Sequence, residues 1–277
     1  MPLQVNNNTA AFNVFTSYSS NMTQLQQSMK RLSSGVKQIK DDSSGVGISE
    51  RMRAQIRSTA MARTNVGNGL SLLQTADAWL QNINDMLSRM HELCINANDG
   101  TKTAEDKVNI QSEFSALQNE IVRVTSHNTA AAKFNGLYLF RGGNGRAIIN
   151  GDEVETGSVN VQIGADSGQS FGLTLADLQV TNSTVIGTVS SYTYSTDNTV
   201  SSESHQPVTW MSVIDHNQMS VSSADGLGMI IQAINYVSNT RAKLGAQQVR
   251  LDLAHSGLLS YEDNLRLLAE ERRWPAS

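Results

Sequence analysis

The sequence predicts a mainly α-helical protein: an elongated antiparallel helical bundle or coiled-coil rod with a small β-rich hairpin region at its distal end. The main observation is a segment of more than fifty residues, 43–98, that contains no proline. From Val66 onward its small or apolar residues recur at alternating steps of three and four, which keeps one stripe toward a partner helix. The same spacing returns in two later segments, 103–128 and 224–268.

The first segment, residues 1–42, predicts a weak amphipathic helix. Ser, Thr and Asn dilute its apolar stripe, and these residues are poor helix formers in isolation. The stripe consists of Phe15, Met22, Leu25, Met29, Leu32 and Val36. We therefore expect this helix to be unstable until another surface packs against it.

The second segment predicts one long helix over residues 43–98. A helix of that length would extend about 80 Å, more than a globular domain of this size can surround. We expect Gly100 to end the helix in a left-handed conformation. The positions of this helix expected in the bundle seam are Leu73, Leu80, Ile83 and Leu87.

The third segment, residues 103–128, predicts a shorter helix antiparallel to the second. Thr103 followed by Asp106 resembles a capping box, which favours a helix start at this point. The expected seam positions of this helix are Ile110, Phe114, Leu117 and Ile121.

Beyond Phe134 the pattern changes to alternation and glycine. FNGLYLFRGGNG predicts a turn and a short strand, and residues 158–178 predict a β-hairpin across Ala165 to Gly168. Residues 181–222 are rich in Ser, Thr and Val, with low charge and no period. We expect irregular strands or exposed loops there.

The last segment, residues 224–268, returns to helix on a seven-residue lattice. Polar Arg241, Gln248 and His255 on that lattice would weaken the seam but fix its register. The expected seam positions are Ile234, Leu244, Leu251 and Leu258. Because two helices cannot cover their own stripes, we expect all three long helices to bundle together.

Composition excludes several functional classes. A net charge of −4 and a pI near 5.7 give no reason to expect a nucleic-acid partner. No run of 18 apolar residues occurs, so no membrane insertion is expected. The N-terminus lacks the basic start and apolar run of a cleavable secretory signal. The single Cys94 lies on the apolar stripe and is interpreted as a core residue.

No catalytic, metal-binding or cofactor-binding residues are predicted. His91 and Glu92 lack the second histidine of a zinc motif, so a solvated helix face explains them better. Asp41 and Asp42 could form an acid–base pair, but adjacent acids before a helix more commonly act as cap and dipole partners. The residues therefore favour a structural role.

Nine short motifs give the chain a resemblance to bacterial flagellins. They are RLSSG at 31–35, DDSSG at 41–45, SERMRAQIR at 49–57, NGLSLLQTADAWL at 68–80, LSRMHEL at 87–93, NANDGT at 96–101, FNG at 134–136, QIGAD at 162–166 and LGAQQVRL at 244–251. The resemblance implies a filament subunit that serves motility, exported unfolded through the flagellar type III apparatus and assembled beneath a cap protein.

The resemblance also implies a division of the chain. Residues 1–42 would be an inner, channel-lining helix with its connecting segment, and 43–180 the N-terminal part of the rod with its two helices and β-hairpin. Residues 181–222 would be a variable outer region, and 223–277 the C-terminal rod helix with a truncated end. The partners implied are copies of itself or other flagellins, the cap and the hook-associated proteins. The location implied is a secreted filament, extracellular or periplasmic.

Three positions resemble the flagellin surface that the next subunit covers and that a vertebrate toll-like receptor recognises. They are Arg89, Leu93 and Glu113, in the motifs LSRMHEL and IQSEF. Buried Arg and Leu are frequent interface anchors, so a subunit contact is better supported than receptor binding.

The chain departs from the family pattern at its C-terminus, which ends in EERRWPAS where flagellins continue with an inner helix. A truncated minor flagellin that serves surface display or adhesion is therefore one alternative. A hook–filament junction protein is another, because YLFRGG resembles the glycine-rich turn of that relative. RLSSG and LGAQQVRL favour flagellin.

Overall fold

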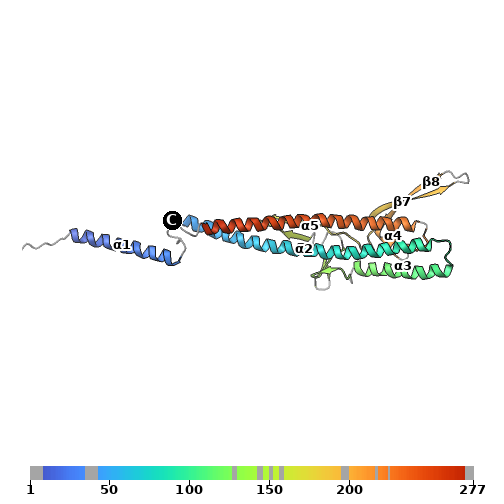
Figure 1. The fold of residues 1–277 in the computed structure, drawn as a ribbon, viewed down its shortest axis with the longest axis horizontal. Coiled ribbons are helices and arrows are strands. Elements are labelled where there is room, and N and C mark those ends of the chain that lie inside the picture. Colours follow the sequence, from blue (N-terminus) through green and yellow to red (C-terminus); the bar gives the residue numbers. More distant parts are fainter. Residues whose placement is uncertain are drawn as a thin grey trace, which may run out of the picture. The chain divides into compact units, whose positions relative to one another are not determined.

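The computed structural model describes residues 9–34, 43–126, 130–141, 146–149, 152–155, 159–194, 200–215, 218–223 and 225–271. The chain forms two compact units, which we treat separately. The first unit comprises residues 1–61 and 257–277, and the second comprises residues 62–256. The predicted fold class is confirmed, because long helices dominate and the strands form only small antiparallel sheets (Figure 1).

The first unit contains helix α1 (Thr9–Ser34), the beginning of α2 (Ser43–Ala97) and the end of α5 (Gly226–Glu271). Every described side chain of α1 is exposed. Thr16 and Thr23 donate their hydroxyls to backbone carbonyls four residues earlier, as threonines in exposed helices often do. Asp42, which was expected to act as a cap of α2, and Val36 of the predicted apolar stripe lie outside the described residues.

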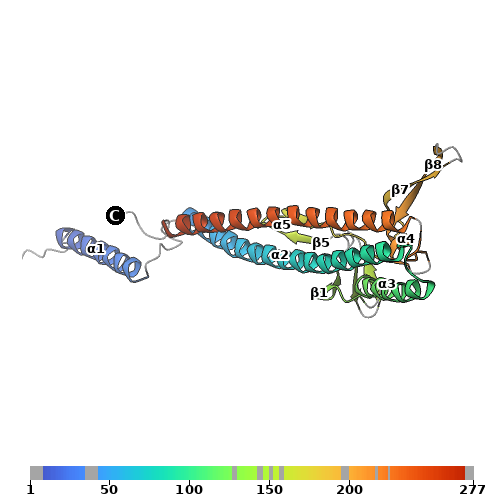
Figure 2. The same ribbon diagram turned by 45° about the vertical axis from the view of Figure 1, so that its right-hand side comes forward.

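In the second unit the remainder of α2 lies beside the remainder of α5, and α3 (Ala104–Thr125) lies on another side of α2 (Figures 1 and 2). The Arg241 guanidinium of α5 contacts the Asp77 carboxylate of α2, with 2.8 Å between Nε and Oδ1, and it also donates to Gln81. The expected pairing of helices from opposite ends of the sequence is therefore confirmed. Arg241 therefore contacts α2 directly, and its predicted role in fixing the register of the two helices stays a prediction.

The end of α2 differs from the prediction at Gly100. Among the described glycines, Gly136 and Gly168 have positive φ angles, and Gly100 does not. The chain turns instead through Asp99, whose carboxylate accepts from the Thr101 amide at 3.1 Å and from its hydroxyl at 2.7 Å. These bonds lower the pKa of Asp99. An Asx-type turn needs no left-handed residue, so the prediction for Gly100 was wrong.

The start of α3 agrees with the prediction. Thr103 accepts from the Asp106 amide at 3.2 Å, and the Asp106 carboxylate accepts from the Thr103 amide at 3.0 Å. This is a complete capping box, so two amides that the first turn would leave unpaired are satisfied. An ion pair between Arg89 of α2 and Glu113 of α3 confirms that the two helices form an antiparallel hairpin.

Four short strands follow α3 in the order of the chain. They are β1 (Lys133–Phe134), β2 (Leu137–Tyr138), β3 (Arg146–Ile149) and β4 (Asp152–Glu155), and each pairs antiparallel with the next. The β1–β2 turn consists of Asn135 at φ 47° and Gly136 at φ 81°. Two successive positive φ angles are what Asn-Gly favours in a two-residue hairpin, so the predicted turn is confirmed.

The predicted hairpin between residues 158 and 178 is also confirmed. Strands β5 (Val159–Gln162) and β6 (Ser170–Leu173) pair antiparallel, with Val161 opposite Phe171. The hairpin lies where α2 and α5 converge. A Cβ placed on Gly69 of α2 would lie 3.1 Å from a Val161 methyl carbon and 3.5 Å from Leu251 of α5. The glycine in the apolar stripe therefore makes room for the hairpin.

The Ser/Thr/Val-rich region is more regular than predicted. Strands β7 (Val185–Tyr194) and β8 (Val200–Thr209) form a two-stranded antiparallel hairpin, with register irregularities near each end of β7. Val, Ile, Thr and Tyr are favourable strand residues, and this preference outweighs the missing alternation. Figures 1 and 2 show the hairpin projecting away from the helices of the second unit.

A short helix that the sequence analysis did not predict, α4 (Trp210–Ile214), follows β8 directly. Its first residue, Trp210, is fully buried and donates its indole N–H to the Leu178 carbonyl at 2.7 Å. Thr209 caps the helix by exchanging bonds with Ser212. The helix anchors the base of the β7–β8 hairpin in the core.

Glutamines join the helices to the irregular segments. Gln118 of α3 donates to the Val213 carbonyl at 3.0 Å, and Gln111 accepts from the Val221 amide at 2.7 Å. Gln247 of α5 bonds to both the amide and the carbonyl of Thr174. Each bond supplies a partner for a backbone group outside the regular ladders.

Candidate subunit interface

The α2–α3 hairpin places three charged side chains together on the surface. Arg89 donates from Nε to Oε1 of Glu113 at 2.9 Å and from Nη1 to Oε2 of Glu92 at 2.9 Å. The Arg89 and Glu113 side chains are 50% and 48% exposed, so the pair remains accessible. The predicted positions Arg89 and Glu113 therefore lie next to each other, although they are 24 residues apart in the chain.

The charges in this cluster have a simple electrostatic arrangement. The hydrogen bond to Glu113 is the main cause that raises the pKa of Arg89, and the bond to Glu92 adds to it. Exposed ion pairs contribute little to folding because water screens them. The cluster is thus an oriented polar surface, one cation between two carboxylates, that a partner could contact without opening the fold.

Leu93 differs from the other two predicted positions because its side chain is only 2% exposed. It lies inside the second unit and is not on the surface of the single chain. The sequence does contain a signal for the burial of Leu93. It is the last of four apolar residues that are spaced seven apart, after Leu72, Trp79 and Met86. That lattice marks a second flank of α2, which is buried at Leu72 and Leu93 and half-buried at Trp79 and Met86.

The twelve predicted seam positions fall into two groups. The first is buried and consists of Leu73, Leu80, Ile83, Leu87, Phe114, Ile121, Leu244 and Leu251. The second is half-buried and consists of Ile110, Leu117, Ile234 and Leu258. Leu258 belongs to the first unit and the others to the second. The half-buried members leave parts of the seam open to solvent.

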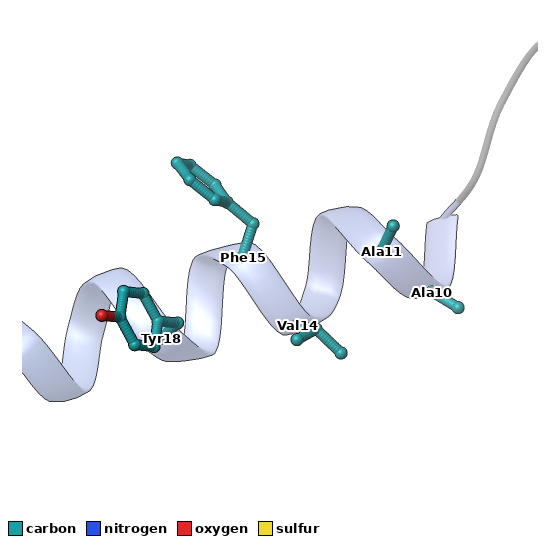
Figure 3. Close-up of a pocket in the computed structure, with 5 residues that line it drawn as sticks. All are labelled: Ala10, Ala11, Val14, Phe15 and Tyr18. Carbon is teal, nitrogen blue, oxygen red and sulfur yellow. The ribbon is translucent and has the colours of Figure 1, made fainter.

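An extended exposed apolar surface of the first unit lies along α1. Phe15 is 68% exposed and Val14 is 69% exposed. Figure 3 shows these two side chains leaving the helix in different directions, with Tyr18 one turn further along. Ala10, Ala11, Val14, Phe15 and Tyr18 line a shallow pocket on the helix surface. Apolar side chains this exposed usually mark a surface that another molecule covers.

A smaller exposed stripe lies on α5 within the second unit. Val249 is 59% exposed and Leu253 is 69% exposed. Ala242 and Ala246 precede them at the same helical spacing and are also exposed. Because this spacing of four, three and four keeps one face, the residues form a continuous apolar strip. The sequence analysis assigned α5 one seam and did not identify this second face.

The described part of the chain holds no cluster of three or more His, Cys, Asp or Glu side chains that could bind a metal ion. Cys94 is fully buried, and burial raises the pKa of its thiol to about 11. A neutral, enclosed thiol is a poor nucleophile. None of the described helices is both long enough and apolar enough to cross a bilayer.

Comparison with known proteins identifies the family. The family model for the bacterial flagellin N-terminal helical region matches residues 5–145. Flagellin FlaB2 of Treponema pallidum (strain Nichols) is 33% identical over 257 residues, which covers 90% of this chain and 78% of that protein. The flagellar filament 33 kDa core protein of Treponema phagedenis is 32% identical over 274 residues, with 97% and 85% covered.

Among solved structures, flagellar hook associated protein-3 of Legionella pneumophila has the same fold. The TM-score is 0.58 at 13% identity, and the match covers 81% of this chain and 98% of that one. The long paired helices, the hairpins packed on them and the sequence matches over most of the chain agree with one another. The chain belongs to the bacterial flagellin family.

Proposed function

We propose that this chain is a structural subunit of a bacterial flagellar filament that polymerises through its helices and serves motility. The flagellin family is a structural one, and relatives across nine-tenths of the chain are named as flagellins. The observation that carries the proposal is α1, a helix of 26 residues whose described side chains are all exposed. A long apolar stripe left in water favours burial against other copies.

The subunit acts by contact and not by catalysis. Weak contacts repeated in every copy produce a stiff polymer, and an open helical arrangement lets it grow without limit. In this scheme α1 becomes covered on assembly in the inner part of the filament. Residues 181–222, which include the β7–β8 hairpin, form its outer surface.

The α2–α3 surface around Arg89 and Glu113 contributes to the contact with the next subunit. Its exposure supports this role, because both side chains are about half accessible. The same surface is a candidate site for a vertebrate toll-like receptor. Leu93 takes part in either contact only indirectly, by supporting α2 from inside, since it is buried.

Export and assembly involve other flagellar proteins in this proposal. The chain leaves the cell through the flagellar export apparatus and joins the filament at its tip, where the cap protein and hook-associated proteins are its partners. A junction role is a weaker candidate, because the likeness to a hook-associated protein is at 13% identity and concerns the fold. The relatives above 30% identity carry flagellin and filament-core names.

Seeded polymerisation tests the proposal. Purified chain is mixed with short fragments of filaments made by a full-length flagellin, and growth is followed by light scattering and electron microscopy. We expect labelled chain to be incorporated into filaments that extend from the seeds. Chain that stays soluble at every seed concentration and ionic strength would overturn the filament proposal.

A further inference from the structure

The β7–β8 hairpin has two outer edges that no other strand of the described chain occupies. An unpaired edge carries backbone N–H and C=O groups that can bind a further strand, so proteins usually block it. The two edges of this hairpin differ in that respect.

Gln232 reveals which backbone groups point outward. Gln232 belongs to α5, and its Nε2 donates to the Thr188 carbonyl at 3.4 Å. This carbonyl therefore points away from β8. Thr188 is opposite Pro207 in the register. In an antiparallel pair, residues whose backbone groups point away from the partner form the non-hydrogen-bonded pairs, and these alternate along the ladder. The next such pair is Ser190 with His205.

The outer edge of β8 is blocked by Pro207. Because Pro207 is in a non-hydrogen-bonded pair, its nitrogen lies on the outer side, where a further strand would need an N–H donor. The strand also contains the acidic residue Glu203. Proline and charge are two common means of preventing strand addition.

The outer edge of β7 has neither a proline nor a charged residue, and in the described part of the chain α5 contacts it only near Thr188, whose carbonyl accepts from Gln232. The strand reads VIGTVSSYTY, with no proline and no charged residue, and it is rich in strand-favouring Val, Ile, Thr and Tyr. Thr188 and Ser190 are both exposed. The ladder alternation places the N–H and C=O of Ser190 on this open edge.

We propose that the outer edge of β7 binds the same edge of β7 in a second copy of this chain, antiparallel and centred on Ser190. The two Ser190 residues then exchange two N–H to C=O hydrogen bonds across a two-fold axis, and a four-stranded sheet with β8 at both outer sides results. A second copy fits because an uncharged strand places no like charges opposite each other when it pairs with itself. The blocked β8 edges stop the sheet from growing further.

This contact has a consequence for assembly that rests on the proposed function. A two-fold axis joins two copies head to head, whereas the repeat within one filament relates copies by rotation and translation. The β7 contact therefore links subunits of neighbouring filaments, side by side, and favours bundles.

Sedimentation velocity of the full chain over a concentration series tests the proposal. Ser190→Pro removes the outward N–H but leaves the β7–β8 ladder intact, and we expect its dimerisation to be about 30-fold weaker, because two bonds are lost across the axis. The matched control is His205→Pro, at the register partner of Ser190 on the other edge. It should dimerise like the parent chain. Equal dimerisation of the two variants would overturn the proposal, as would a parent chain that shows no dimer.

A cross-linking experiment does not depend on a proline variant that folds. In Ser190→Cys the two thiols lie opposite each other, so a short bismaleimide should convert the chain to covalent dimer. His205→Cys should associate like the parent chain but give no covalent dimer, because its thiols lie on the outer strands of the sheet, and the parent chain reports any background from Cys94, which is fully buried. Equal yields from the two cysteine variants would contradict β7 pairing.

Electron microscopy separates this proposal from the filament proposal. With seeds, the parent chain should give bundled filaments and Ser190→Pro should give single filaments of the same diameter. Single filaments from both chains would refute the β7 contact and leave the filament role intact. Dimers in sedimentation without filaments on any seed would refute the filament role instead.

Discussion

Helix α1 and the second-unit part of α2 carry the same apolar spacing and have opposite surroundings. In α1, Phe15, Tyr18, Met22, Leu25, Met29 and Leu32 follow each other at steps of three and four. In α2 the same steps connect Val66, Gly69, Leu73, Ala76 and Leu80, which are buried. The α1 residues are between 39% and 86% exposed. Spacing thus predicts that a face will be covered, but it does not tell whether the cover comes from the same chain.

The difference reflects where each helix finds a partner. In α2 the stripe residue Gly69 lies against Val161 of the β5–β6 hairpin and Leu251 of α5, and charged residues beside the stripe contact α3 and α5, so the chain itself supplies the neighbours. For α1 the polar residues between the apolar positions weaken the helix in isolation. A marginal helix with an uncovered stripe is suited to a segment that becomes ordered when copies meet.

The largest expected effect is a charge placed in the α2 stripe. Leu80→Asp should lower the free energy of unfolding of the chain by about 4 kcal/mol, because Leu80 is fully buried and a carboxylate there would have to be removed from water. Urea unfolding followed by helical circular dichroism measures the loss. The control is Asn82→Asp at an exposed position of the same helix, which should change stability by less than about 0.5 kcal/mol. Unchanged melting of Leu80→Asp would refute the seam.

The next effect concerns the ion pair between α5 and α2. Arg241→Ala should cost about 1 kcal/mol, because the pair is about one-third exposed and water screens part of the attraction. The loss should become smaller in high salt. A double-mutant cycle with Asp77→Ala measures the coupling between the two side chains. Additive losses in that cycle would show that the contact does not connect the helices.

The cap of α3 gives a similar effect with a pH dependence. Thr103→Ala should cost about 1 kcal/mol at neutral pH, as the loss of an N-cap usually does. The hydrogen bond from the Thr103 hydroxyl is the main cause that lowers the pKa of Asp106 in the folded chain. A lowered folded pKa means stability that is present above the ordinary carboxyl pKa and lost as the pH falls through the folded value.

Titration of stability between neutral and acid pH checks this sign. The parent chain should lose part of the α3 contribution in the acid range, and Thr103→Ala should lose less, since its Asp106 titrates closer to the ordinary value. Parallel pH profiles for the two chains would show that the capping box is not formed in solution.

The smallest expected effect on folding is the sharpest test of the comparison. Phe15→Asp should change the free energy of unfolding of the soluble chain by less than about 0.5 kcal/mol, because Phe15 is 68% exposed. The same variant should fail to extend filament seeds, since the charge would be buried between copies. Asn13→Asp, an exposed polar position of the same helix, is the control that should still assemble. Normal assembly of Phe15→Asp would mean that α1 stays uncovered in the polymer.

Local patterns in the sequence predicted most of the helical framework. Periodicity identified α2, α3 and α5, the Thr103–Asp106 spacing identified a cap, and Asn135-Gly136 identified a turn. Gly100 was misjudged because the Asp99 side chain supplied the turn instead. Helix α4 was missed because its five residues are too few to show a period, and its stability comes from the buried Trp210.

The candidate site was predictable only in part for a similar reason. The resemblance identified Arg89 and Glu113, and the structure places them in contact. It did not reveal that Leu93 is buried, because burial depends on which flank of α2 meets other parts of the fold. The glutamine contacts to backbone groups, such as Gln118 to Val213, depend on positions 95 residues apart and leave no local pattern.

The fluorescence emission of the Trp210 indole depends on whether the base of the β7–β8 hairpin stays packed in the core. Its ring is fully buried and its N–H is bound to the Leu178 carbonyl. Shielded indoles emit at shorter wavelengths than hydrated ones, so a detached hairpin would shift the emission to the red. In a variant whose other two tryptophans, Trp79 and Trp274, are replaced by Phe, the attachment of β7 and β8 can therefore be followed in real time by intrinsic fluorescence while copies of the chain associate.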